Sequence, residues 1–110
     1  MSKFKQLSSG VYVAGQLEVD DVVRAHAEGI KTIVCNRPDE EGGPSSATLA
    51  ATARELGVEF VYLPMASPAD AASHAEDCAA QLQREGDILL YCRSGRRSTV
   101  LWEAARASAA

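Results

Sequence analysis

The sequence has few aromatic residues and no long hydrophobic run. Only 5% of its 110 residues are aromatic although 46% are hydrophobic, so a buried core has to be built mainly from Val, Ile, Leu and Ala. No stretch approaches the roughly twenty apolar residues that a membrane-spanning helix needs. Residues 1–5 are not followed by the apolar segment of a signal peptide. We therefore expect a cytoplasmic protein that does not bind membranes.

Cysteine is also scarce, and its three occurrences are not arranged as pairs. Cys35, Cys78 and Cys92 are irregularly spaced and no C-x-x-C motif is present. This pattern predicts neither a disulfide framework nor a zinc ribbon. His26 and His74 are isolated, so we expect no metal and no cofactor. Reduced thiols in a reducing compartment are the simplest interpretation.

An excess of positive charge is missing as well, since the formal net charge is −4. An acidic protein repels nucleic acid and anionic membranes. A site for an anion would have to be a local concentration of cations. The length is that of one domain, and we treat residues 1–110 as a single domain.

Apolar runs that are typical of strands alternate with helical patterns along the chain. We predict strands at 11–14, 32–35, 59–63 and 88–91, with a hairpin partner before Gly10. We predict helices at 19–28, from Ser45 or Ser46 to 56, at about 69–84, and from 97 or 98 to the C-terminal alanines. This order predicts an α/β three-layer sandwich, with helices on both faces of a mostly parallel sheet of four to five strands. Ligands of such sheets bind at the carboxyl ends of the strands, which here are followed by loops after Cys35, Leu63 and Tyr91.

The loop after Tyr91 contains most of the chemical information. It consists of Cys92, Arg93, Ser94, Gly95, Arg96, Arg97 and Ser98. A turn from a strand into a helix points backbone N–H groups inward and adds the positive end of the helix dipole, which lowers the pKa of a cysteine there. We expect a solvent-accessible Cys92 thiolate in an anion-binding cup formed by the residues of this loop.

Individual residues of this loop have separate expected roles. Gly95 lets the backbone turn, Arg97 can fork onto two oxygens of an oxyanion, and Ser98 can cap the helix or donate to the sulfur. The alternative is a buried cysteine followed by a solvated basic turn. Three arginines without an acid in one loop of an acidic chain favour the functional interpretation.

The loop after Cys35 supplies further candidates. Arg37 could add a cation, and Asp39 could orient an arginine or act as an acid, although a simple turn explains these residues equally well. Asp70 could act as an acid but is better explained as the start of a helix. Cys35 could be a resolving thiol if its strand neighbours that of Cys92, but a buried core cysteine is the simpler interpretation.

The 92–98 loop resembles the active-site loops of two superfamilies. Tyrosine and dual-specificity phosphatases place five residues between Cys and Arg. Rhodanese-type sulfurtransferases have a tighter C-R-x-G-x-R loop, and four residues separate Cys92 from Arg97 here. Over nearly its whole length, in the stretches 10–16, 32–39 and 91–98, the chain is similar to a bacterial phosphatase-like family that includes domains fused to beta-lactamase-like hydrolases. The resemblance implies a dual-specificity-phosphatase-like fold that carries a sulfurtransferase loop.

Three functions follow from these observations. The first is a sulfurtransferase, in which Cys92 takes sulfane sulfur from thiosulfate or a persulfide and passes it to a thiol acceptor. The second is a phosphatase that acts on a phosphate ester, with Cys92 as nucleophile, Arg97 as clamp and Asp39 or Asp70 as acid. The third is a non-catalytic anion-binding module. The tight loop and the lack of an acid after the strand at 59–63 favour the first.

Overall fold

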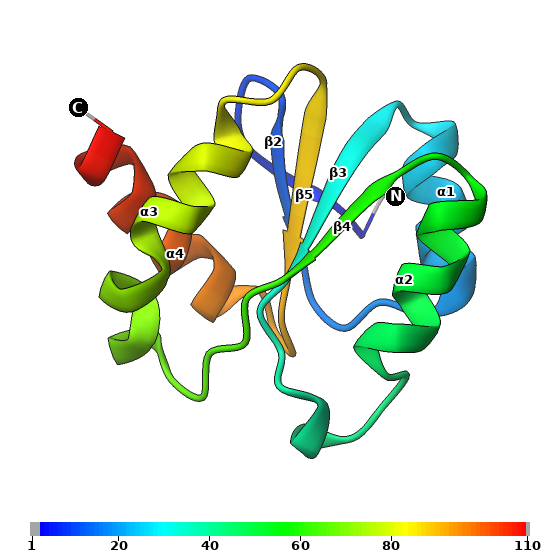
Figure 1. Cartoon of the computed structure of the whole chain (residues 1–110), viewed down its shortest axis with the longest axis horizontal. Coiled ribbons are helices and arrows are strands. Elements are labelled where there is room, and N and C mark those ends of the chain that lie inside the picture. The colour runs from blue at the N-terminus through cyan, green and yellow to red at the C-terminus, as the bar shows by residue number, and fades with distance from the viewer. Residues whose placement is uncertain (1–2, 110) are drawn as a thin grey trace.

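One five-stranded sheet forms the centre of the protein. In the computed structural model, which describes residues 3–109, the strands are β1 (Lys5–Ser8), β2 (Val11–Ala14), β3 (Ile30–Cys35), β4 (Glu59–Tyr62) and β5 (Asp87–Tyr91). Their order across the sheet is β1-β2-β5-β3-β4. Only β1 runs antiparallel to its neighbour, because it forms a hairpin with β2, and the other pairings are parallel. β5 therefore lies in the middle of the sheet (Figure 1).

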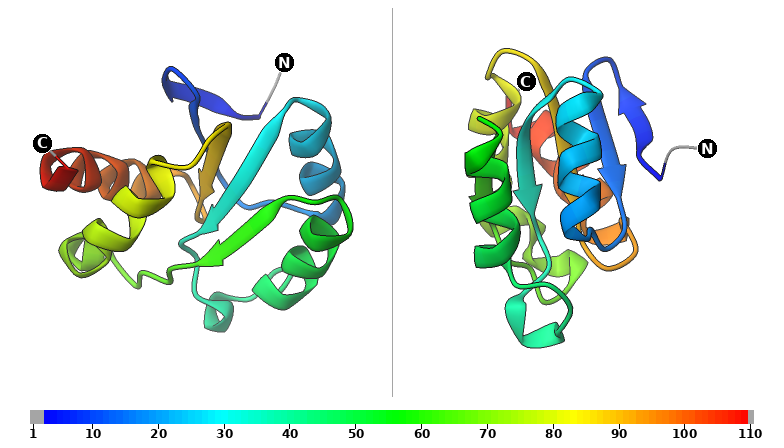
Figure 2. Two further views of the ribbon diagram at one scale, coloured as in Figure 1. Left: turned by 45° about the horizontal axis from the view of Figure 1, so that its top comes forward. Right: turned by 90° about the vertical axis from the view of Figure 1, so that its right-hand side faces the viewer.

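Four α-helices cover the sheet on both faces. They are α1 (Val19–Ala27), α2 (Ser46–Glu55), α3 (Ala71–Leu82) and α4 (Arg96–Ala109), and two short 3₁₀ helices, η1 (Asp39–Glu41) and η2 (Pro68–Asp70), lie in the loops. Figure 2 shows α1 and α2 on one side of the sheet and α3 and α4 on the other. The expected α/β three-layer sandwich is thus confirmed.

Alternation along the buried strands divides the core between the two faces. Leu89 packs in the cluster on the side of α1 and α2, whereas Leu90 packs in the cluster on the side of α3 and α4. Both side chains are fully buried. Successive side chains of a strand point to opposite faces of the sheet, so a run of apolar residues such as 88–91 serves both layers.

The predicted boundaries needed small changes. β3 begins at Ile30 rather than at 32, because the chain re-enters the sheet directly after Gly29, whose φ of +93° ends α1. α4 begins at Arg96 rather than at 97 or 98, which shortens the preceding loop. Within residues 3–109, no helix combines the length and the apolar character that crossing a bilayer requires.

The parallel order brings the carboxyl ends of four strands to the same edge of the sheet. β5 lies between β2 and β3, so the segment after Tyr91 is flanked by those after Ala14 and Cys35. The end of β4 lies one strand further along. The candidate residues of two separate loops are therefore placed together at this edge.

Substitution of Leu89 by Ala tests the assignment of β5 to the centre of the buried sheet. Leu89 is 0% exposed, and removing a buried leucine side chain costs about 2–5 kcal/mol of the free energy of unfolding. The control is Val23→Ala on α1, where the side chain is 47% exposed and the loss should stay below about 1 kcal/mol. Urea denaturation measures both, and equal losses would contradict the assignment of Leu89 to the core.

Candidate active site

The turn between β5 and α4 wraps around the sulfur of Cys92. The backbone N–H of Gly95 donates a hydrogen bond to Cys92 Sγ over 3.1 Å. Gly95 has φ +93°, a left-handed conformation that residues with a Cβ rarely adopt. The first turn of α4 begins directly afterwards, with the Thr99 N–H bonded to the Gly95 carbonyl at 3.0 Å. The sulfur thus lies at the N-terminus of a helix.

These donors shift the pKa of Cys92 downward. Burial by itself raises the pKa of a thiol, but the backbone N–H groups of Ser98, Ser94 and Gly95 donate toward the sulfur and outweigh this effect. Hydrogen bonds to the charged form stabilise that form. The pKa of Cys92 is therefore below the ordinary value of a thiol, as expected from the loop sequence.

The sulfur is not open to solvent, and the expectation of an accessible thiol is wrong for this conformation. Cys92 is 0% exposed. The physical reason is that a four-residue turn, from Cys92 to Gly95, closes tightly enough for an amide to reach the sulfur.

The end of β2 packs against the back of this turn. An added Cβ on Gly15 would stand 2.9 Å from the carbonyl oxygen of Arg93. The Gln16 N–H donates to the same carbonyl at 3.2 Å, and the Cys92 N–H reaches the Ala14 carbonyl at 3.4 Å. A glycine at position 15 therefore allows the backbone contact that holds the turn in place.

Buried polar contacts connect the turn to β3 and β4. Ser98 Oγ donates to Asn36 Oδ1 at 2.8 Å, and Asn36 Nδ2 donates to the Leu63 carbonyl at 2.9 Å. Ser98 and Asn36 are both 0% exposed. Ser98 was expected to cap the helix or donate to the sulfur. Its hydroxyl donates to Asn36, and both its backbone N–H and its side chain are hydrogen-bond partners of the sulfur that lower the pKa of Cys92.

Arg97 is engaged by a carboxylate that the sequence analysis did not single out. Its Nη1 lies 2.7 Å from Glu41 Oε2 and its Nη2 lies 2.9 Å from Glu41 Oε1. Nη1 also donates to the Met65 carbonyl at 2.7 Å. The hydrogen bonds with Glu41 raise the pKa of Arg97, and those from Arg97 lower the pKa of Glu41.

Of the candidates in the loop after β3, Arg37 lies in the same network. Its Nη2 donates to the Glu41 carbonyl at 2.8 Å, its Nη1 to Gln16 Oε1, and its Nε lies 3.4 Å from Glu41 Oε1. Asp39 lies elsewhere, because its carboxylate accepts from the N–H and hydroxyl of Ser46 at 2.8 and 2.9 Å. Asp39 therefore supports the N-terminus of α2, whose N-cap is Ser45.

The remaining candidates have structural contacts. Asp70 Oδ2 accepts the N–H groups of Ala66 and Ser67 at 2.9 and 3.2 Å. Cys35 is buried, and its Sγ lies 3.4 Å from the Arg37 carbonyl. In the sheet register Cys35 pairs with Tyr91, the residue before Cys92, and it packs with Tyr91 in the cluster under α1 and α2. These contacts fit a core residue, and a resolving role for Cys35 stays a prediction.

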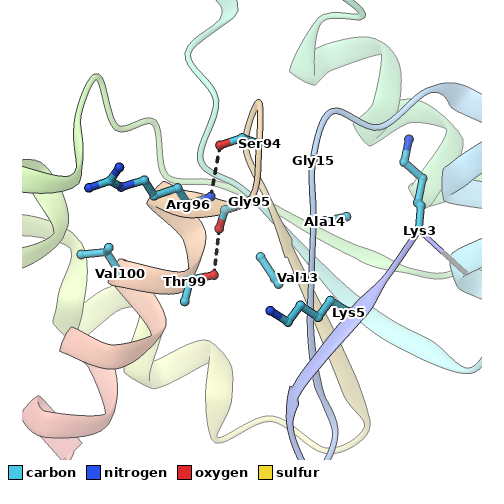
Figure 3. A pocket seen from close by; sticks show the side chains of 10 residues that line it. All are labelled: Lys3, Lys5, Val13, Ala14, Gly15, Ser94, Gly95, Arg96, Thr99 and Val100. Carbon is cyan, nitrogen blue, oxygen red and sulfur yellow. Dashed lines mark hydrogen bonds between the residues drawn. The ribbon is translucent and has the colours of Figure 1, made fainter.

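Two pockets flank the loop. A cleft of about 590 Å³ is lined by Glu41, Ala66, Ser67, Pro68, Arg93, Ser94, Arg96 and Arg97. A pocket of about 390 Å³ on the other side is lined by residues that include Lys5, Val13, Gly95 and Thr99. Figure 3 shows this second pocket between β1, β2 and the start of α4, with Arg96 directed away from it. The cleft contains Arg97 and the exposed side chains of Arg93 and Arg96, and it is the anionic-ligand site that the geometry favours.

The site is a cysteine loop at the carboxyl edge of a mostly parallel sheet, and solved structures of phosphatases share this fold. The sequence profile of the family described as "Beta-lactamase hydrolase-like protein, phosphatase-like domain" matches residues 3–109. The chain therefore belongs to this family. A beta-lactamase hydrolase-like protein from Agrobacterium fabrum (strain C58) is 26% identical over 106 residues, which cover 91% of this chain and 24% of that protein. The chain thus spans about a quarter of this curated relative.

Solved structures show the same fold. A candidate phosphatase from Neisseria meningitidis has a TM-score of 0.79 and 36% identity, over 99% of this chain and 79% of that one. TpbA from P. aeruginosa, as a cysteine-to-serine variant in complex with pTyr, has a TM-score of 0.59 and 21% identity. That match covers 84% of this chain and 54% of TpbA, and at this identity it shows the fold alone.

A titration of the thiols tests the loop electrostatics. Burial raises the pKa of Cys78 to about 12 and also raises that of Cys35, so only Cys92 should ionise below the usual thiol range. We expect the ultraviolet absorbance of a thiolate to appear in the wild type at a lower pH than for free cysteine, and to be lost in Cys92→Ser. A Cys92 pKa at or above that of free cysteine would contradict the account.

Substitution of Gly15 by Ala tests the support of the loop from behind. Gly15 does not have a positive φ, so an alanine there is not strained by its backbone and acts only through the contact with Arg93. We expect the turn to shift and the pKa of Cys92 to rise toward its ordinary value. The same titration measures this, and an unchanged pKa would show that the contact does not position the turn.

Proposed function

We propose that the protein is a cysteine-dependent phosphatase in which Cys92 is the nucleophile. The observation that carries the proposal is a sulfur that accepts a backbone hydrogen bond in a tight turn beside an arginine-rich cleft, and these donors lower the pKa of the thiol. The family description and the candidate phosphatase at 36% identity support this class of reaction. TpbA, which has the same fold, was solved with pTyr.

The reaction follows from these groups in two steps. The Cys92 thiolate attacks phosphorus, an S–P bond forms, and the P–O bond to the leaving group breaks with its electron pair on oxygen. Water then attacks phosphorus, the S–P bond breaks, and phosphate leaves while the thiolate is restored. The loop amides and Arg97 stabilise the charge on the equatorial oxygens.

The cleft limits the leaving groups that can depart. Among residues 3–109, Glu41 is the only carboxylate that lines it, and the contacts of Arg97 lower the pKa of Glu41 so that it stays ionised. Asp39 and Asp70 accept hydrogen bonds elsewhere. Without a protonated acid, an alkoxide leaves slowly. We therefore propose substrates whose leaving group is stable as an anion, such as aryl phosphates, over alkyl phosphates.

The buried sulfur adds a conformational step to this proposal. Cys92 is fully buried and in-line attack requires contact between sulfur and phosphorus. Loop and lid motions that admit substrate commonly precede chemistry. The cleft beside the loop, lined by Arg93, Ser94 and Arg97, is the proposed route of entry.

Sulfur transfer is the second candidate, and the length of the loop favours it. Only four residues separate Cys92 from Arg97, and sulfane sulfur carried as a persulfide is smaller than a phosphoryl group. The thiolate would attack the outer sulfur of thiosulfate, break its S–S bond and release sulfite with the electron pair. This step needs no acid, and a thiol acceptor would then take the sulfur from the persulfide.

A pair of assays decides between these functions. The wild type, Cys92→Ser and the core control Cys78→Ala are each given p-nitrophenyl phosphate, an alkyl phosphate, and thiosulfate with cyanide. We expect hydrolysis of the aryl phosphate at least about 10²-fold faster than that of the alkyl phosphate, lost in Cys92→Ser and retained in Cys78→Ala.

Three other outcomes would contradict the phosphatase. Thiocyanate formation that depends on Cys92, without phosphate release, would establish the sulfurtransferase. Neither activity, together with intact oxyanion binding, would establish a non-catalytic anion-binding module. Phosphate release that persists in Cys92→Ser would exclude Cys92 as the nucleophile.

A further inference from the structure

The carboxylate of Glu41 is fixed at the clamp arginine by a set of converging cations. Arg97 contacts both of its oxygens, at 2.7 and 2.9 Å. Arg37 approaches from the other side, holding the Glu41 carbonyl with Nη2 at 2.8 Å and placing Nε 3.4 Å from Oε1. A carboxylate of the protein thus occupies one edge of Arg97, the edge formed by Nη1 and Nη2.

The backbone around Glu41 directs its carboxylate toward Arg97, although the side chain stays 28% exposed. Glu41 is the last residue of η1, and the two glycines that follow have φ of +90° and +74°. An added Cβ on Gly43 would overlap the Arg37 guanidinium, so the close packing of Arg37 beneath the segment depends on a glycine there. Glu40 and Glu41 are both exposed residues, and what distinguishes them is pairing. The Glu41 side chain, 28% exposed, is paired with Arg97 and Arg37, whereas the Glu40 side chain has no hydrogen bond or ion pair within residues 3–109.

The N–H donors of Arg97 that its protein partners do not use are the ones that a ligand could contact. A guanidinium has five N–H donors in a planar fork. Glu41 takes one from each terminal nitrogen, and the Met65 carbonyl takes the second of Nη1. The N–H of Nε and the second N–H of Nη2 form the other edge of the guanidinium, which has the geometry to bind an oxyanion in a bidentate manner. Arg97 also has a side-chain hydrogen bond with Cys92, so an oxyanion that binds this edge shares it with the sulfur.

We propose that Glu41 is a specificity-determining residue of the anion site. It occupies one edge of Arg97 and cancels much of its charge, so a substrate oxyanion binds through the other edge in a less positive cleft. The consequence is discrimination by charge, because a dianion loses more attraction than a monoanion when a neighbouring carboxylate is present. The proposal deepens the proposed function, since it concerns the same cleft.

The carboxylate acts in this way throughout the neutral range. The contacts with Arg97 lower the pKa of Glu41, so the group stays ionised near pH 7. Selection by charge is therefore a constant property of the site near neutral pH.

The test measures binding of sulfate, a dianionic oxyanion, and nitrate, a monoanionic one, by isothermal titration calorimetry at constant ionic strength. The variants are Glu41→Gln and the control Glu40→Gln, which changes the net charge equally. We expect Glu41→Gln to bind sulfate about five- to tenfold more tightly than the wild type, and nitrate about two- to threefold more tightly. Glu40→Gln should stay within about twofold for both ions.

Several results would overturn the proposal. Sulfate affinity in Glu41→Gln that is unchanged or weaker would show that Glu41 only supports Arg97 structurally. An equal increase in affinity for sulfate and nitrate would show that Glu41 does not select by charge. If no variant bound sulfate, the cleft would not be an anion site. Glu41→Asp, which keeps the charge but reaches less far, should lie between wild type and Glu41→Gln and gives a second test if the latter does not fold.

The binding experiment is independent of turnover. Tighter sulfate binding in Glu41→Gln, together with no phosphate release by the wild type, would overturn the phosphatase and leave the role of Glu41 standing. Phosphate release that depends on Cys92, together with sulfate binding that is unchanged in Glu41→Gln, would support the phosphatase and overturn the role of Glu41.

Discussion

The stabilisation of one buried sulfur by backbone amides is the interaction on which the rest of the site depends. Cys35, Cys78 and Cys92 are almost equally buried, yet burial raises the pKa of the first two, whereas the pKa of Cys92 is lowered. The difference is the donors that surround the sulfur. Cys78 packs among apolar side chains of α3 and its neighbours, while the N–H groups of the turn converge on Cys92.

Such a turn needs support from every neighbouring strand, and the sheet order supplies it. β5 lies between β2 and β3, so Gly15 touches the turn from one side and Asn36 holds Ser98 from the other. Asn36 also reaches the Leu63 carbonyl at the end of β4. The parallel sheet thus places four chain segments within hydrogen-bond distance of each other, which a single loop could not do alone.

The sequence predicted the sandwich and the cysteine loop, because both depend on local patterns. Apolar runs indicate buried strands, and the combination of Cys92, Gly95 and arginines marks an anion-binding turn wherever it lies. The roles of Glu41 and Asn36 depend on contacts with residues 56 and 62 positions away, so no local pattern revealed them. Glu41 belongs to an acidic run that usually lies in solvent. The full burial of Cys92 also escaped prediction, because it depends on how tightly the turn closes.

The family and the fold favour phosphoryl transfer, and the short loop and the ionised Glu41 set conditions on it. Both reactions that fit the site begin with a covalent bond to the same sulfur, so the bond itself is the most direct evidence. The decisive measurement is mass spectrometry of the Cys92-containing peptide after rapid acid quenching of turnover with an aryl phosphate. The account predicts a phosphoryl group on Cys92. An unmodified Cys92 together with phosphate release, or an adduct on Cys35 or Cys78, would contradict it.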